Sequence, residues 1–220
     1  MREFPVPHGI YVVTDVLLPP GRTHVAIARA AVAGGARILQ LRDKEAPDEA
    51  LREPAQEIRR LTRAAGVLFV INDRLELARA VGADGVHLGQ SDLPARRARE
   101  SWPEGILGIT VGEADDARRA EADGADYLGL GPIFATQTKG DAGPAVGLAA
   151  IPRVRAASRL PIVAIGGIHL GNVAQIAAAG AAWAAVVSAV VCAPDMEAAT
   201  RALAAAFAAG ERGAGTAARA

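Results

Sequence analysis

The chain has 220 residues, a length that suits one large domain, and apolar residue types make up 51% of it. Lysine plus arginine and aspartate plus glutamate both total 24, so the formal net charge is +0 at pH 7. This balance argues against a general electrostatic attraction to nucleic acid or to an anionic membrane, but it allows a local cationic pocket for a small anion.

Short apolar runs recur along the chain, and each ends in a polar residue or in glycine. Runs of about four to eight apolar residues bounded by turn formers are typical of strands buried on both faces. They predict strands near Ile10–Thr14, Ile38–Leu41, Leu68–Ile71, Gly85–Leu88, Ile106–Thr110, Tyr127–Leu130, Ile162–Ile165 and Ala184–Val187. Helices are predicted after them, at Val25–Ala33, Glu49–Ala65, Leu75–Val81, Ala95–Glu100, Asp115–Ala122, Ala149–Ser158, Val173–Ala179 and Glu197–Ala208. The alternation predicts an α/β fold, a single (β/α)8 TIM barrel over residues 1–208.

The ends of several elements and the last residues are also predicted from local chemistry. Thr23, Asp48 and Asp195 are expected to be helix N-caps. Residues 209–220 are mostly Ala, Gly and Arg, and we expect a disordered tail because this composition cannot bury a core face. The one cysteine, Cys192, excludes an intramolecular disulfide, and its apolar neighbours predict that it is buried.

The sequence favours a cytoplasmic protein. No cationic start followed by an apolar segment opens the chain, so secretion is not expected. The apolar stretch Ile176–Ala193 is interrupted by Gly180 and Ser188, which predicts a helix end plus a buried strand rather than a membrane span.

Two cations follow the second predicted strand. Gln40, Arg42 and Lys44 are spaced two apart, and such positions point to the same side of an extended segment. They can converge on one anion, with arginine supplying a fork and lysine a point charge. The alternative is a solvated charged loop.

Two carboxylates follow neighbouring strands. Asp73 ends the third strand after Asn72, and Asp92 follows the fourth. Adjacent strands lie about 4.8 Å apart, so these side chains can share a magnesium ion that also binds substrate phosphates. The alternative is that each aspartate caps the helix that follows it.

The loops after the last three strands offer hydrogen-bond donors that can bind a phosphate. Thr136-Gln137-Thr138-Lys139 lies in the long loop after the sixth strand. Gly166-Gly167 follows the seventh strand and Val187-Ser188 the eighth, where barrels of this type usually bind phosphate. The alternative for the glycine pair is a simple turn.

His87 lies in the fourth predicted strand, and we expect it to have a hydrogen-bonded core role rather than a catalytic one.

Taken together and in order, these motifs resemble the thiamine-phosphate synthase family from about Ile10 to Phe207. The segments that carry the resemblance are YVVTD (11–15), QLRDK (40–44), INDR (71–74), GVHLGQSD (85–92), DYLGLGPIFATQTK (126–139), AIGGI (164–168) and VVSA (186–189). The family joins the aminopyrimidine 4-amino-2-methyl-5-(diphosphooxymethyl)pyrimidine, a hydroxymethylpyrimidine diphosphate, to the thiazole phosphate 4-methyl-5-(2-phosphooxyethyl)thiazole, which gives thiamine phosphate and pyrophosphate.

The resemblance implies a set of binding residues and magnesium as cofactor. The pyrimidine diphosphate would be bound by Gln40, Leu41, Arg42, Asp43, Lys44, Asn72, Thr110 and Lys139. The thiazole phosphate would be bound by Thr136, Gln137, Thr138, Gly167, Val187 and Ser188, and the metal by Asp73 and Asp92. The family's dissociative displacement needs no general base, and charge stabilisation by Arg42, Lys139 and the metal would suffice.

Two positions depart from the family pattern. Thr110 stands where the family usually has serine, which keeps the hydroxyl and adds a methyl group near the pyrimidine. The segment Gly180-Ala181-Ala182-Trp183-Ala184 replaces the small and acidic residues that the family usually has before the last strand, and we expect Trp183 to pack at the far end of the barrel.

Two other functions stay open. A thiazole tautomerase of the same fold should use a histidine after the fifth strand, where this chain reads Thr110-Val111-Gly112-Glu113. A non-catalytic barrel that binds a thiamine intermediate is the other alternative, against which the intact metal and diphosphate residues count. The expected partners are small molecules, and the sequence leaves the oligomeric state open, a homo-oligomer included.

Overall fold

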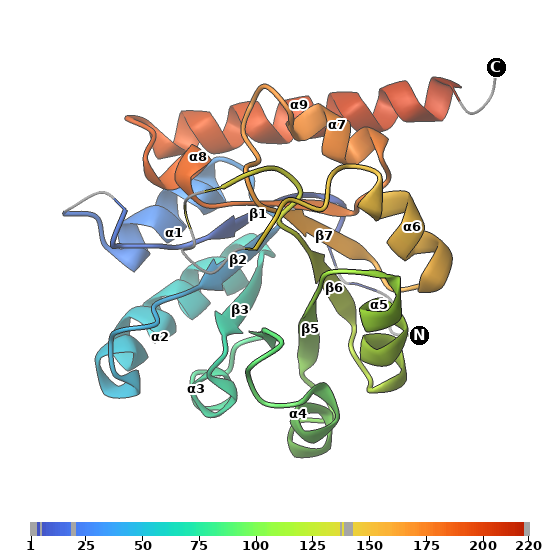
Figure 1. Ribbon diagram of the computed structural model, residues 1–220. Helices are drawn as coiled ribbons and strands as arrows, with labels where there is room; N and C mark the ends of the chain where they lie inside the picture. The colour runs from blue at the N-terminus through green and yellow to red at the C-terminus, as the bar shows by residue number, and fades with distance from the viewer. Residues whose placement is uncertain (1–3, 5, 19–20, 137, 139–142, 218–220) are drawn as a thin grey trace.

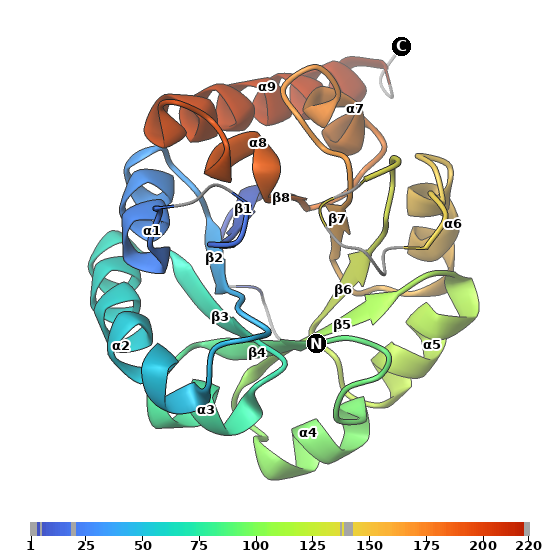
Figure 2. The ribbon, with the colours of Figure 1, turned by 60° about the vertical axis from the view of Figure 1, so that its left-hand side comes forward.

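The computed structural model describes residues 4, 6–18, 21–136, 138 and 143–217. Parallel strands form one closed barrel in which each strand pairs with its sequence neighbours and the last pairs with the first. The strands are β1 (Gly9–Val13), β2 (Ile38–Leu41), β3 (Leu68–Asn72), β4 (Gly85–Leu88), β5 (Ile106–Val111), β6 (Tyr127–Leu130), β7 (Ile162–Ile165) and β8 (Trp183–Val186). The predicted (β/α)8 barrel is therefore confirmed (Figures 1 and 2).

Helices surround the barrel, as Figure 2 shows in a view toward its opening. They are α1 (His24–Ala33), α2 (Asp48–Ala65), α3 (Leu75–Ala80), α4 (Ala95–Ser101), α5 (Ala114–Ala122), α6 (Ala150–Ala157), α7 (Val173–Ala178), α8 (Ser188–Val191) and α9 (Met196–Ala217). Each predicted strand and helix has a counterpart, and the short α8 was not predicted.

Side chains alternate between two cores, because successive residues of a strand point to opposite faces. Ile10 and Val12 of β1 belong to the core between strands and helices. Tyr11 and Val13 face the barrel interior, where Tyr127 and Trp183 also lie. This alternation decides which residues of each strand face the barrel interior.

The amino end of the barrel is closed by aromatic packing. Trp183 is buried, and its indole Nε1 donates to the carbonyl oxygen of Pro7 at 3.0 Å. Phe4 packs on the Trp183 ring at 4.7 Å between ring centroids and meets Tyr127 edge-on at 5.7 Å. The predicted place of Trp183, far from the polar strand ends, is thus confirmed.

Two of the three predicted caps are confirmed. The Thr23 hydroxyl accepts from the amide of Ala26 at 3.1 Å, and the Asp195 carboxylate accepts from the amide of Ala198 at 2.9 Å. The prediction for Asp48 was wrong, because Pro47 precedes the helix and Asp48 is already its first residue. An acidic residue in the first turn still interacts favourably with the helix dipole.

Two other expectations differ from the structure. Helix α9 continues through Ala217, so residues 209–217 are helical rather than disordered, and residues 218–220 of the expected tail fall outside the described residues. The helix lies along α7 (Figure 1), and a Cβ at Gly210 would come within 2.2 Å of the Ala174 carbonyl oxygen, which shows how close the two helices are. Cys192 is exposed rather than buried, because it follows the last residue of α8 on the outside of the barrel.

The apolar stretch Ile176–Ala193, which was expected not to span a membrane, can be compared with the helices of the structure. Within the described part of the chain, no helix combines the length and the apolar character that a membrane span requires. The apolar segment around Ile176 divides instead between α7, β8 and α8.

Candidate functional site

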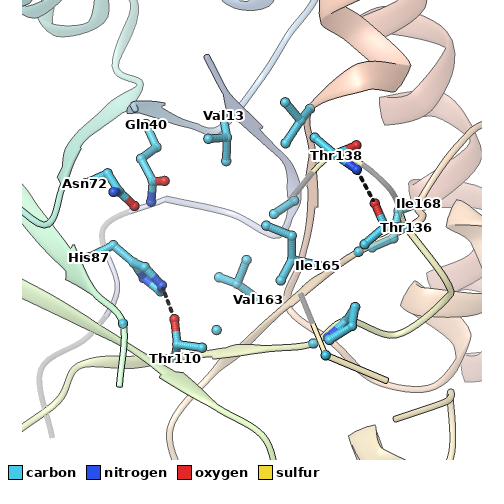
Figure 3. A pocket seen from close by; sticks show the side chains of 18 of the residues that line it. Val13, Gln40, Asn72, His87, Thr110, Thr136, Thr138, Val163, Ile165 and Ile168 are labelled. Carbon is cyan, nitrogen blue, oxygen red and sulfur yellow. Dashed lines mark hydrogen bonds between the residues drawn. The ribbon is translucent and has the colours of Figure 1, made fainter. Parts of the chain in front are cut away.

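A cavity of about 630 Å³ opens at the carboxyl ends of the strands. Figure 3 shows Gln40, Asn72, His87 and Thr110 directed toward the same space from β2, β3, β4 and β5. Thr136 and Thr138 lie on the other side, in the loop after β6. Polar groups from separate strand ends thus meet in one concave site, which is the arrangement expected of a ligand site in this fold.

Many of the predicted site residues line this cavity. They are Gln40, Lys44, Asn72, Asp73, Asp92, Thr110, Thr136, Thr138, Gly167, Val187 and Ser188. Leu41, by contrast, is buried in the core between strands and helices, and Arg42 and Asp43 lie outside the lining. Gln137 and Lys139 fall outside the described residues.

The two carboxylates of the predicted magnesium site interact directly. Burial and, after it, the hydrogen bond and charge of Asp92 together raise the pKa of Asp73 from 3.8 to about 6, while Lys44 and Arg42 oppose the shift. Asp73 has φ of 63°, a left-handed conformation that costs a non-glycine residue about 1–3 kcal/mol. Strain of this kind is typical of functional sites.

The alternative role of these aspartates as helix caps does not hold. Arg74 precedes α3 and Pro94 precedes α4, and neither helix has a side-chain cap bond. Asp92 instead accepts from the amide of Gly89 at 2.6 Å, which fixes its carboxylate beside the cavity. Among the described residues, no group of three or more His, Cys, Asp or Glu side chains could hold a metal. A cation here would therefore need water or ligand oxygens as well, as magnesium usually does.

Arg42 forms a buried ion pair in place of lining the cavity. Its Nη1 lies 3.2 Å from the Asp15 carboxylate, and the two side chains are 13% and 7% exposed. In the described part of the chain, Arg42 Nε is the one buried side-chain nitrogen or oxygen without a hydrogen-bond partner. A buried guanidinium with a spare donor can bind a further anion at low additional desolvation cost.

A second buried series supports the loop that carries Arg42. The Thr14 hydroxyl oxygen accepts from the Arg42 amide at 3.2 Å and lies 2.8 Å from His24 Nδ1. His24 Nε2 lies 3.2 Å from Asp43, whose carboxylate also accepts from the amides of Glu45 and Ala46. These backbone bonds and His24 lower the pKa of Asp43 despite its desolvation. Asp43 therefore holds the loop in place from outside the cavity.

Inside the barrel, five polar side chains form a continuous series of hydrogen bonds. Gln40 Nε2 donates to the Tyr11 hydroxyl at 2.7 Å, and that hydroxyl lies 3.1 Å from the hydroxyl of Tyr127. His87 Nδ1 lies 3.0 Å from the Tyr127 hydroxyl, and His87 Nε2 lies 3.0 Å from Thr110 Oγ1. The hydrogen bonds expected of His87 are confirmed, but its side chain is half-buried and lines the cavity rather than lying in the core.

Sequence reasoning missed the two tyrosines of this series. Tyr11 and Tyr127 are buried, and both occupy inward-facing positions of their strands. A signal was present in the strand glycines, because an interior glycine in a strand often marks the close approach of another group. A Cβ at Gly108 would lie 2.0 Å from the Tyr127 ring, and one at Gly129 would lie 2.7 Å from the His87 ring.

The glycine pair after β7 adopts a backbone that other residues rarely reach. Gly166 and Gly167 have φ of 102° and 63°. A Cβ at Gly167 would lie 2.6 Å from the Ala135 carbonyl oxygen, so the pair packs tightly under the loop after β6. Asn172 Nδ2 donates to the Gly167 carbonyl at 2.9 Å and holds the turn from the other side. The pair is therefore a required turn that also lines the cavity.

Comparisons with known proteins agree with this geometry. The family model described as thiamine monophosphate synthase matches residues 10–190. The chain is 54% identical over 197 residues to the thiamine-phosphate synthase of Methanoculleus marisnigri, covering 89% of this chain and 93% of that protein. It is 53% identical over 195 residues to the enzyme of the same name from Moorella thermoacetica, covering 88% and 93%.

A solved structure supports the same relationship. Thiamine phosphate pyrophosphorylase from Pyrococcus furiosus superimposes with a TM-score of 0.85 at 39% identity, covering 92% of this chain and 96% of that one. The family match spans most of the barrel, and the identity to relatives extends over nearly the whole length of both chains. The chain belongs to the thiamine-phosphate synthase family.

Proposed function

We propose that this chain is a transferase that joins a hydroxymethylpyrimidine diphosphate to a thiazole phosphate and releases thiamine phosphate and pyrophosphate. The observation that carries this proposal is the cavity at the carboxyl end of the barrel, where amide, hydroxyl, ammonium and carboxylate groups from several strands meet. A family relationship at about half identity over most of the chain supports it.

The pyrimidine side of the site lies over β2 to β5. Gln40 and Thr110 offer hydrogen bonds to the ring, and Asn72 and Lys44 can bind the diphosphate. We place Lys139 in the same diphosphate site, although it lies outside the described residues. Arg42 would bind the diphosphate after its side chain turns toward the cavity, where phosphate oxygens replace Asp15 as its partner.

Asp73 and Asp92 would hold a magnesium ion beside the diphosphate. Their mutual repulsion, the left-handed backbone of Asp73 and their place on the cavity wall fit a divalent cation with open coordination positions. When bound, the ion would neutralise charge on the departing pyrophosphate.

The thiazole phosphate is placed across the cavity, near Thr136, Thr138, Gly167, Val187 and Ser188. Hydroxyls and the closely approaching glycine backbone supply its hydrogen bonds, and Gln137 would join them from outside the described residues. The two substrates then lie within one cavity, which holds them close together and displaces water from between them. The displacement needs no general base in this arrangement.

A direct assay tests the proposal. The purified protein is mixed with both substrates and magnesium, and thiamine phosphate and pyrophosphate are measured. Formation of both products at equal rates supports the synthase. Isomerisation of a thiazole substrate with no coupling would favour the tautomerase, and binding without any product would favour the non-catalytic barrel.

A further inference from the structure

The series of hydrogen bonds within the barrel links two groups of the cavity that do not touch each other. Gln40 is at one end and Thr110 at the other, and both face the space where the proposed function places the pyrimidine ring. Between them lie Tyr11, Tyr127 and His87. Whether Gln40 and Thr110 donate or accept a hydrogen bond toward the cavity therefore depends on which of the three middle side chains donates at each link.

The direction of the series follows from the amide of Gln40. Its Nε2 is a donor, so the Tyr11 oxygen accepts. Among the described residues the Tyr11 hydroxyl has one other partner, Tyr127, to which it must donate. Burial raises the pKa of Tyr11 and Tyr127, so each hydroxyl keeps the one hydrogen it donates.

The same argument continues to Thr110. Because the Tyr127 oxygen accepts from Tyr11, its own hydrogen goes to His87 Nδ1. A neutral imidazole that accepts at Nδ1 carries its hydrogen on Nε2, which donates to Thr110 Oγ1. The Thr110 hydroxyl is then left as a donor toward the cavity, and the Gln40 amide oxygen is left as an acceptor.

The barrel reserves space for this series. Gly108 and Gly129 stand on β5 and β6, where any side chain would collide with the rings of Tyr127 and His87 respectively. The His87 and Tyr127 rings are stacked, with centroids 5.5 Å apart and an interplanar angle of 27°. The central members are thus fixed by packing as well as by hydrogen bonds.

We infer that Tyr127 is a positioning residue that couples Gln40 to Thr110, so that the site selects an aminopyrimidine over the oxo analogue in which a carbonyl replaces the amino group. An aminopyrimidine has an amine donor beside a ring-nitrogen acceptor, which match the Gln40 oxygen and the Thr110 hydroxyl. The oxo ring has a carbonyl acceptor beside a ring N–H donor. To accept it, all five side chains must reverse together, including the Gln40 amide.

This inference rests on the proposed function, and the test is the ratio of two dissociation constants. Calorimetry with magnesium gives the affinities for the aminopyrimidine diphosphate and for its oxo analogue. In Tyr127→Phe, His87 and Thr110 can reverse without Gln40, so the preference for the amino compound should fall at least about tenfold, which is about 1.4 kcal/mol. Tyr11→Phe cuts the neighbouring link and should have the same effect if Tyr127→Phe does not fold.

A control variant separates loss of a buried hydroxyl from loss of coupling. Thr200 is buried in α9, and its hydroxyl donates to the Met196 carbonyl at 2.8 Å, remote from the series. Thr200→Val should leave the ratio unchanged. A ratio that stays the same in both tyrosine variants, or that falls equally in Thr200→Val, overturns the inference.

A spectroscopic readout tests the direction of the series without any substrate. Nitrogen-15 chemical shifts of the imidazole should show His87 as the Nε2–H tautomer in the unaltered protein and as a mixture in Tyr127→Phe. A dominant Nδ1–H tautomer overturns the assigned direction. If the unaltered protein forms no thiamine phosphate, the proposed function fails instead, and with it the substrate named here.

Discussion

Asp73 and Asp92 place two carboxylates against each other where neighbouring strands end. Burial and the negative charge of Asp92 together raise the pKa of Asp73 to about 6. The protein thus holds two like charges in contact and gives Asp73 a left-handed backbone. Such an arrangement is unfavourable without a counter-charge, and the proposed divalent cation between the carboxylates would make it favourable.

The stability of the metal-free protein should depend on the titration of Asp73. Its folded-state pKa is raised above the ordinary 3.8, so the folded state binds more protons than the unfolded state between that value and about 6. The stabilising contribution of the protonated group is present at low pH and is lost as the pH rises through about 6. In chelator, the melting temperature of the unaltered protein should therefore fall relative to Asp73→Asn between about pH 4 and about pH 7. A difference that does not change with pH would contradict this.

Asp92→Asn should remove most of the turnover while the loop stays in place. The asparagine oxygen can still accept from the Gly89 amide, but the negative charge for magnesium is gone. We expect at least about a 100-fold loss of turnover, since metal stabilisation of charge is worth several kcal/mol. The N-cap variant Asp195→Asn serves as the control. Equal turnover of the unaltered protein in excess chelator would show that magnesium is not required.

Arg42 should act on the diphosphate and not only on stability. Changing it alone would leave Asp15 as an unpaired buried carboxylate, so we compare Asp15→Asn with the double variant Asp15→Asn, Arg42→Gln. The double variant should lose about 100-fold in turnover relative to the single one, because one lost contact to developing charge costs about 3 kcal/mol. Steady-state kinetics with both variants folded gives the comparison, and equal rates would remove Arg42 from the mechanism.

Gly167→Ala should weaken thiazole-phosphate binding more than pyrimidine-diphosphate binding. The added Cβ would lie 2.6 Å from the Ala135 carbonyl and 2.8 Å from Phe134 Cβ, and the backbone has φ of 63°. The loop that carries Thr136 must therefore move. We expect thiazole-phosphate affinity to fall at least about tenfold, as loss of one or two hydrogen bonds would predict.

Calorimetry with each substrate checks this result. Gly171→Ala is the matched control, because it lies in the same loop and its Cβ would meet only the His169 side chain, at 3.1 Å. If both substrates weaken equally in Gly167→Ala, the thiazole phosphate does not lie beside this turn.

The order of strands and helices was determined by the sequence itself, and most of the site residues predicted from it line the cavity. Strands buried on both faces require continuous apolar runs, and parallel strands joined by helices must bring their carboxyl ends to one side. The sequence alone therefore predicts that Gln40, Asn72 and Asp73 lie at the carboxyl end of the barrel. Local patterns suffice here because each signal lies within one strand and the residues that follow it.

Only the tertiary structure decided the partners of these residues. Asp15 pairs with Arg42 from another strand end, and Tyr11 meets Tyr127 across 116 residues of sequence. Likewise, composition predicted a disordered end for a helix that packs on α7, and apolar neighbours predicted a buried place for Cys192. Burial and hydrogen bonding depend on which elements the closed barrel brings together, and that closure is a property of the whole chain.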